Sequence, residues 1–274
     1  MAADVTGGEA KATDVVAAQP VAPAPPRAET PHRWRFLALY GLLGVALGAT
    51  AAAVVIAFNS TLGTGGPAWS AWRPAGGGLG AMRQIAERVG GEYRLPNDDQ
   101  LVDVIAKAPS VTLSKTTIPV GYLALRGSGG AVDQLLQVSG SNSVMYTLCG
   151  LGPSCTIATG KASVARGRLV RREILELALY TFRYVGGIDN VIALMPPSSA
   201  TKAPVVVYLR RSDLGAELSV PLRDSLATRA PSPATMSKPE TQLVDATTGS
   251  RAYSFSLTRA QDGNTILVLA PLAA

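Results

Sequence analysis

Histidine is almost absent from this chain of 274 residues. His32 is the only one, so no residue after it can supply an imidazole. Ser-His-Asp and Cys-His catalysis and histidine-ligated metals are thereby excluded from the remaining sequence. Catalysis by a Ser-Lys pair or by two carboxylates is not excluded. No cluster of metal ligands and no complete cofactor motif stands out, so we expect neither a metal ion nor a cofactor.

Charge is absent from one long stretch, Phe36–Phe58, which reads FLALYGLLGVALGATAAAVVIAF. As a helix this run would be roughly 34 Å long, enough to cross a hydrocarbon core about 30 Å thick. It predicts a transmembrane helix over residues 36–58. A cleaved signal peptide is the alternative, although the run is longer than the usual hydrophobic region of such peptides.

Basic residues flank only the N-terminal end of this run. Arg33 and Arg35 precede it, whereas no charge follows it before Arg73. The positive-inside tendency therefore places the N-terminus in the cytoplasm and the rest of the chain outside, in a single-pass protein of the cell membrane. Residues 1–35 have no apolar periodicity and are predicted to be a disordered cytoplasmic tail.

Small residues shape the next two segments. Gly41, Gly44 and Gly48 lie on one face of the predicted membrane helix, a spacing that lets two such helices approach closely. Residues 59–78 are rich in Gly, Pro and Ser and are expected to be a spacer. Its two tryptophans, Trp69 and Trp72, fit either the membrane interface or the beginning of the outer core.

The remaining residues, 79–274, predict one α+β domain with a mostly antiparallel sheet and one long covering helix. A short helix is expected at residues 78–91 and an interrupted one at 213–227. The strand-like segments are 101–106, 118–126, 131–139, 143–149, 190–196, 204–211, 252–259 and 264–272. The segments from 118 to 149 suggest an antiparallel meander, residues 230–240 a polar loop, and the last two strands a hairpin around Asp262.

The long helix is expected over Ser163–Val185. Its apolar face contains Val170, Ile174, Leu177, Ala178, Thr181 and Val185. The opposite face contains Arg168, Arg172, Glu176 and Arg183, and is expected to be solvated, with Arg172 and Glu176 paired one turn apart.

Cysteine occurs only twice, at Cys149 and Cys155 in the segment CGLGPSC. Outside the cytoplasm, two thiols separated by a Gly/Pro turn most simply form a structural disulfide. A redox pair would more typically be spaced C-x-x-C, and zinc would need further ligands that the sequence does not offer.

The start of the long helix is the main candidate for a binding site. Thr159–Ser163 is similar to part of a phosphate loop, but Cys155 stands where that motif needs its first glycine. Ser163 is better explained as the helix N-cap. Lys161, Ser163, Arg166 and Arg168 could nevertheless seat an anion at the helix N-terminus. A solvated basic face is the simpler interpretation.

The formal net charge of +6 comes entirely from the sequence after residue 35, because residues 1–35 contain four basic and four acidic residues. A basic outer domain favours anionic surroundings, such as lipid headgroups, an anionic wall polymer or an acidic envelope protein. Nucleic-acid binding is not expected, because it needs a stronger basic stripe with aromatic residues between the charges.

Residues 146–197, from YTLCGLGPSCTIATGKASVARGRLVRREILELALYTFRYV onward, resemble a group of uncharacterised single-pass membrane proteins from high-GC actinobacteria. Weaker similarity occurs at YRLP, residues 93–96, and in the C-terminal SFSL and LVLAPL segments. The resemblance implies topology and architecture only, because no activity or catalytic residue can be transferred from that group.

Together these features predict an envelope protein whose outer domain binds or scaffolds another envelope component. Whether the chain is an enzyme stays open, with a non-enzymatic role favoured. A cell-wall hydrolase or transferase that uses carboxylates or a Ser-Lys pair is the alternative. A sensor that passes an outside signal to the cytoplasmic tail is a third possibility.

Overall fold

The computed structural model describes residues 68–113, 116–127, 129–199 and 202–272. They belong to one compact unit, Gly66–Ala274. The predicted tail, the predicted membrane helix and its glycines Gly41, Gly44 and Gly48 lie outside the described residues. Within the described ranges, no helix is both long and apolar enough to cross a membrane.

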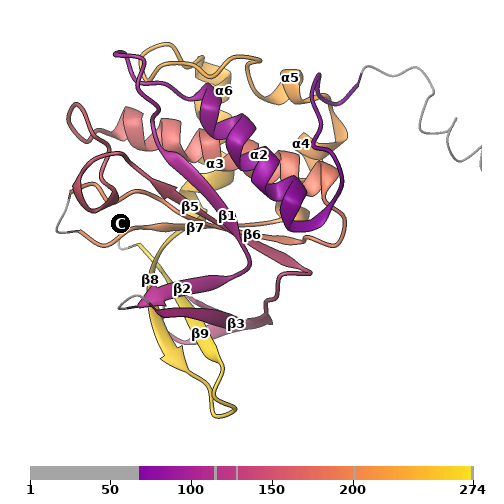
Figure 1. The fold of residues 1–274 in the computed structure, drawn as a ribbon, viewed down its shortest axis with the longest axis vertical. Coiled ribbons are helices and arrows are strands. Elements are labelled where there is room, and N and C mark those ends of the chain that lie inside the picture. The colour runs from indigo at the N-terminus through magenta and orange to yellow at the C-terminus, as the bar shows by residue number, and fades with distance from the viewer. Residues whose placement is uncertain (1–67, 114–115, 128, 200–201, 273–274) are drawn as a thin grey trace, which may run out of the picture. The chain divides into compact units, whose positions relative to one another are not determined.

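In the described part of the chain, nine strands form one nearly closed, mostly antiparallel sheet (Figure 1). They are β1 (Asp103–Lys107), β2 (Ser110–Leu113), β3 (Thr116–Arg126), β4 (Val132–Gln137), β5 (Ser143–Cys149), β6 (Asn190–Leu194), β7 (Val206–Arg210), β8 (Ala252–Arg259) and β9 (Thr265–Pro271). The order is β1-β5-β6-β7-β8-β9-β3-β2, and β4 pairs with β3. Only the β5/β6 and β3/β9 pairs are parallel.

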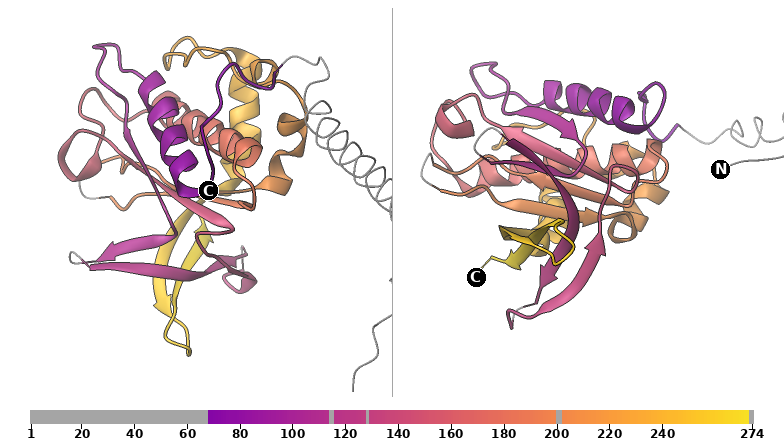
Figure 2. Two further views of the ribbon diagram at one scale, coloured as in Figure 1. Left: turned by 45° about the vertical axis from the view of Figure 1, so that its right-hand side comes forward. Right: turned by 60° about the horizontal axis from the view of Figure 1, so that its bottom comes forward.

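Helices cover the β1-β5-β6-β7 part of this sheet (Figures 1 and 2). The α-helices are α2 (Gly78–Glu92), α3 (Val164–Tyr184), α4 (Gly215–Ser219), α5 (Leu222–Ser225) and α6 (Lys238–Thr248). Short 3₁₀ segments occur at Pro153–Cys155, Arg211–Leu214 and Gly249–Arg251. Both α2 and α6 pack against α3, the longest helix.

The sheet separates two apolar cores. Because neighbouring strand residues point to opposite faces, Val144 and Tyr146 of β5 join the helix-side core, whereas Met145 joins the other. Residues of β3 and β9, such as Leu123 and Leu267, complete the second core. Burying both faces of β5, β6 and β7 explains why these strands read as almost continuous apolar runs.

The predicted α+β class and mostly antiparallel sheet are confirmed, and so is the hairpin around Asp262, formed by β8 and β9. The predicted meander is wrong. β3 pairs with β4, but β5 pairs with β1 and β6 instead of β4. Apolar alternation identifies a strand but not its partner, and here distant segments supply the partners of β5.

The sequence predicted one long covering helix, which is α3. In the structure, α2 and α6 pack beside it. Helix α6 was not predicted: its first residues fall in the predicted polar loop, which ends at Glu240. A side-chain N-cap marks the beginning of this helix: the Ser237 hydroxyl accepts a hydrogen bond from the Glu240 backbone N–H at 3.3 Å. The pattern Ser-x-x-Glu was therefore a usable signal.

The first described residues belong to the core. Trp69 is buried and packs edge-on against Tyr180 and Tyr184, with ring centroids 5.6 and 5.7 Å apart. Trp72 packs against Tyr180 in the same way. The predicted spacer, residues 59–78, therefore overlaps the folded domain. Of the two interpretations of these tryptophans, the structure supports the one in which they begin the core.

Candidate functional site

The middle of the charged face of α3 is buried instead of solvated, whereas Arg183 near its C-terminal end is exposed as predicted. The side chain of Arg172 is fully buried, and that of Glu176 is only 15% exposed. They do form the predicted ion pair, at 2.9 Å, but inside the domain. The physical reason is that α2 and α6 pack beside α3 and cover the face that points away from the sheet.

All three nitrogen atoms of the Arg172 guanidinium donate hydrogen bonds. Its Nε donates to Glu240 Oε1 at 2.6 Å, and its Nη2 donates to the Ala227 carbonyl at 2.8 Å. Its Nη1 donates to Glu176 and to the hydroxyl of Tyr93. Arg172 thus connects the end of α2, helix α3, helix α6 and the segment after α5. A buried charge with this many partners holds the helices together.

Glu173 is the exception in this region. Its side chain is fully buried, and neither carboxylate oxygen has a hydrogen-bond partner. Desolvation raises the pKa of Glu173 well above its ordinary value of 4.5, and the nearby Glu176 carboxylate raises it further. Burial therefore favours the protonated, uncharged form of Glu173. Neither Glu173 nor Glu176 lines the cavity at the other end of the helix.

This cavity lies at the N-terminus of α3 and has a volume of about 670 Å³. Its apolar lining consists of Ile157, Val164, Val170, Met195, Pro196, Pro197, Val205, Ala252 and Leu272, with Ala162 and Ala203. Three basic residues, Arg166, Arg171 and Lys202, also line it. No aspartate or glutamate is among its described lining residues.

The helix terminus adds polarity to this apolar space. Ser163 is the N-cap, and its hydroxyl accepts a hydrogen bond from the Arg166 backbone N–H at 3.2 Å. Gly160 has a φ of +75°, and a Cβ there would collide with the Arg166 guanidinium. The glycine therefore allows that guanidinium to lie close against the backbone. The cavity combines a cationic side chain with the positive end of a 21-residue helix.

The other arginines near the N-terminus of α3 are neutralised by Asp245 of α6. Arg168 and Arg171 approach its carboxylate at 2.8 and 2.6 Å, and Arg171 also donates to the Thr248 hydroxyl. The hydrogen bond from Arg168 is the main reason that the pKa of Asp245 is lowered. By contrast, the Arg166 guanidinium has no carboxylate partner and donates no hydrogen bond to any residue within the described ranges.

Of the predicted anion-site residues, Ser163 and Arg166 lie at the cavity. Arg168 is instead paired with Asp245, and the exposed Lys161 is not among the lining residues. Arg171, which was considered only as an extension of this basic surface, also lines the cavity, whereas Lys202 and the apolar residues of the β6–β7 connection were not predicted. No local signal links that connection to the start of α3, because the two meet only through the fold.

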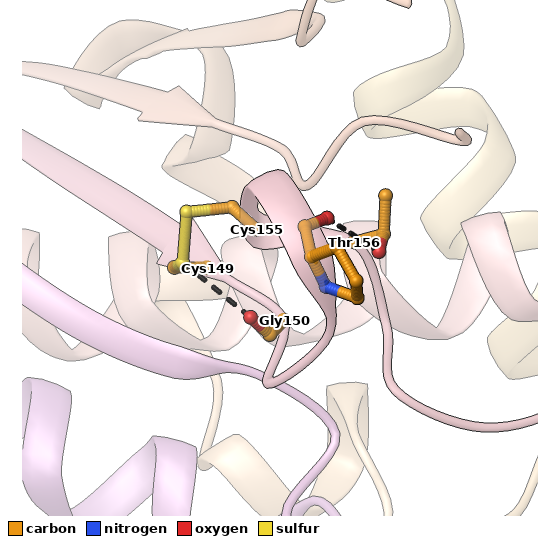
Figure 3. The surroundings of a disulfide bond; sticks show 5 residues. Cys149, Gly150, Cys155 and Thr156 are labelled. Carbon is orange, nitrogen blue, oxygen red and sulfur yellow. Dashed lines mark hydrogen bonds between the residues drawn. A yellow bond between two sulfur atoms is a disulfide. The ribbon is translucent and has the colours of Figure 1, made fainter. Parts of the chain in front are cut away.

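A disulfide lies next to Thr156, a residue that lines the cavity; Figure 3 shows the disulfide and Thr156. Cys149 and Cys155 are joined by a 2.07 Å S–S bond, which fits the disulfide predicted from the sequence. Within the closed loop, the Gly152 N–H donates to the Thr156 carbonyl at 2.7 Å. Thr156 and the next residue, Ile157, line the cavity. The disulfide thus holds a cavity wall next to the end of β5.

Comparisons with protein families, with curated proteins and with solved structures found no match for this chain. The resemblance to actinobacterial membrane proteins therefore stays a prediction, and the functional argument rests on the cavity itself.

Proposed function

We propose that this chain is a single-pass, membrane-anchored envelope protein whose outer domain is a binding module for an anionic ligand that also has an apolar part. The anchor and orientation rest on residues 36–58 and their basic N-terminal flank. The observation that carries the binding role is the cavity at the N-terminus of α3, where Arg166 has no anionic partner among the residues that the structure describes.

The cavity has two chemically different surfaces, and each favours one part of such a ligand. The helix N-terminus and the Arg166 guanidinium favour a phosphate or carboxylate group. The wall formed by Met195, Pro196 and Val205 favours an aliphatic or other apolar group, because burying it removes apolar surface from water. The volume of about 670 Å³ lies in the range of small-molecule sites.

The test uses the full chain in nanodiscs of zwitterionic lipid and three soluble probes: octyl phosphate, octanol and inorganic phosphate. Isothermal titration calorimetry measures binding, with empty nanodiscs as the blank. We expect octyl phosphate to bind at least about tenfold more tightly than either other probe, because only it uses both surfaces. Equal affinity for octanol and octyl phosphate would contradict the charge argument, and absence of binding by all three would contradict the site.

One observation keeps the hydrolase or transferase alternative in view: Ser163, Ser198 and Lys202 line the same cavity. A Ser-Lys mechanism needs the lysine amine to accept the serine proton. The Ser163 hydroxyl accepts the N-cap hydrogen bond from the Arg166 N–H, but no hydrogen bond joins it to Lys202 among the described residues. Turnover of a wall polymer that disappears in Lys202→Met while octyl phosphate still binds would favour the enzyme over the binding module.

A further inference from the structure

Strand β1 lies at one end of the strand order and pairs only with β5 among the described strands. A groove of about 420 Å³ follows this strand, and α2, which lies beside β1 in Figure 1, supplies its other wall. Gln100 and Asp103–Ala106 line the strand side of the groove. A free strand edge with a groove along it offers backbone hydrogen bonds to a further strand.

Three side chains of β1 point to the same face, because they alternate along the strand: Asp103, Ile105 and Lys107. Ile105 is 50% exposed, although both its neighbours, Val104 and Ala106, are buried. Asp103 and Lys107 form no ion pair and no side-chain hydrogen bond with any described residue. Burial lowers the pKa of Lys107, so this amine is partly desolvated without a compensating carboxylate.

The sequence of β1, DVIAK, is complementary to itself when two copies run antiparallel. A register centred on Ile105 places Asp103 of each copy opposite Lys107 of the other and brings the two Ile105 side chains together. Opposite charges and apolar side chains in directly facing positions stabilise a strand pair.

We propose that β1 is a self-association surface, through which two copies of this chain pair antiparallel and continue the sheet across a twofold axis. The second copy is the occupant that the edge favours, because its own β1 supplies the carboxylate that Lys107 lacks and the apolar contact that Ile105 lacks. This proposal does not depend on the ligand of the α3 cavity.

Crosslinking in membranes containing the full chain tests the pairing directly. In Ile105→Cys, the new thiols of two copies lie next to each other, and a short bis-maleimide joins them, since Cys149 and Cys155 are bonded to one another. The matched control is Leu135→Cys on β4, whose side chain is 58% exposed. We expect a crosslinked dimer with Ile105→Cys and at least about tenfold less with Leu135→Cys. Similar yields from both would overturn the proposal.

Charge reversal in the Ile105→Cys background shows whether the register is right. Asp103→Lys turns both cross-copy pairs into repulsions, and the crosslinked fraction is expected to fall about tenfold. Adding Lys107→Asp restores opposite charges and is expected to restore the crosslink. If the double variant stays uncrosslinked, or if the thiol joins a different protein instead, β1 does not pair with itself.

Discussion

Arg172 and Arg166 belong to the same helix but have opposite surroundings. Arg172 is fully buried and donates to two carboxylates, a tyrosine hydroxyl and a backbone carbonyl. Arg166 lines an open cavity and has no acidic partner among the described residues. Both are arginines on a helix that the sequence describes as amphipathic, so residue type alone does not separate them.

The difference shows which arginine holds the fold and which is available to a ligand. A buried guanidinium must be paired, because an isolated buried charge costs several kcal/mol. A partly exposed one tolerates the lack of a partner, because water solvates it until an anion arrives. The unpaired arginine at a cavity, not the best-connected one, is therefore the better candidate for binding.

Replacing Arg172 tests the structural role that this comparison assigns to it. Arg172→Met is expected to lower the free energy of unfolding by about 3–5 kcal/mol, because Glu240 and Glu176 stay buried without their cation. Urea unfolding followed by circular dichroism measures it. Arg166→Met on the same helix is the control, expected within about 0.5 kcal/mol of the wild type. Equal losses in the two variants would show that Arg172 has no special structural role.

Removing the disulfide affects the cavity side of the molecule. Cys149→Ser with Cys155→Ser is expected to lower the free energy of unfolding by about 2–3 kcal/mol, because the unfolded chain gains freedom. Octyl phosphate affinity should fall too, because Thr156 and Ile157 lose the link that positions them. Unchanged affinity in the folded variant would show that the wall is held by the other loop contacts.

Glu173 extends the comparison to a buried acid without a hydrogen-bond partner, whose burial favours the protonated, uncharged form. Glu173→Met removes two buried oxygens without partners and is expected to raise the free energy of unfolding by about 1–3 kcal/mol at pH 7.

The pH dependence of the same variant gives an independent check. The folded-state pKa of Glu173 is raised above 4.5, so its contribution to stability is fully present below pH 4.5 and is lost as the pH rises toward the folded-state pKa. The wild type should therefore lose stability over that interval, and Glu173→Met should lose less. Parallel stability curves for both proteins would mean that Glu173 is ionised in the fold.

The smallest expected effect comes from Asp245, which is 39% exposed and lies between the two regions. Asp245→Asn should lower the free energy of unfolding by less than about 1 kcal/mol, since solvent screens exposed ion pairs. It frees Arg171, which lines the cavity, so octyl phosphate should bind about twofold to fivefold more tightly. Calorimetry measures the affinity, and weaker binding would indicate that Asp245 orients Arg171 for the ligand.

Local patterns were enough to predict much of the fold. The apolar periodicity of α3, its N-cap Ser163 and the hairpin at Asp262 are all encoded within a few neighbouring residues. The pairing of β5 with β1 and β6 was not, because it depends on contacts between distant segments. The burial of Arg172 was missed for the same reason: it follows from α6, whose Ser237-x-x-Glu240 signal was overlooked.

The candidate site was predictable in part. Ser163 and Arg166 follow from the capping and charge pattern at the helix N-terminus. That Arg168 is neutralised while Arg166 is not depends on Asp245, which lies 77 residues after Arg168 and approaches through the packing of α6 on α3. The apolar wall around Met195 and Val205 likewise comes from a separate connection. A single sequence does not show that Asp245 comes close to Arg168, or that the residues around Met195 and Val205 come close to the start of α3.

The most direct test of the central claim compares Arg166→Gln with Arg168→Gln in the full chain, titrated with octyl phosphate in zwitterionic nanodiscs. Both variants remove one positive charge from the same turn of α3, so nonspecific attraction falls equally. We predict that Arg166→Gln weakens binding by about tenfold to a hundredfold, the value of a hydrogen bond to a charged group, whereas Arg168→Gln changes it less than about threefold. Equal losses in the two variants would contradict the distinction between paired and unpaired arginines on which the proposed site rests.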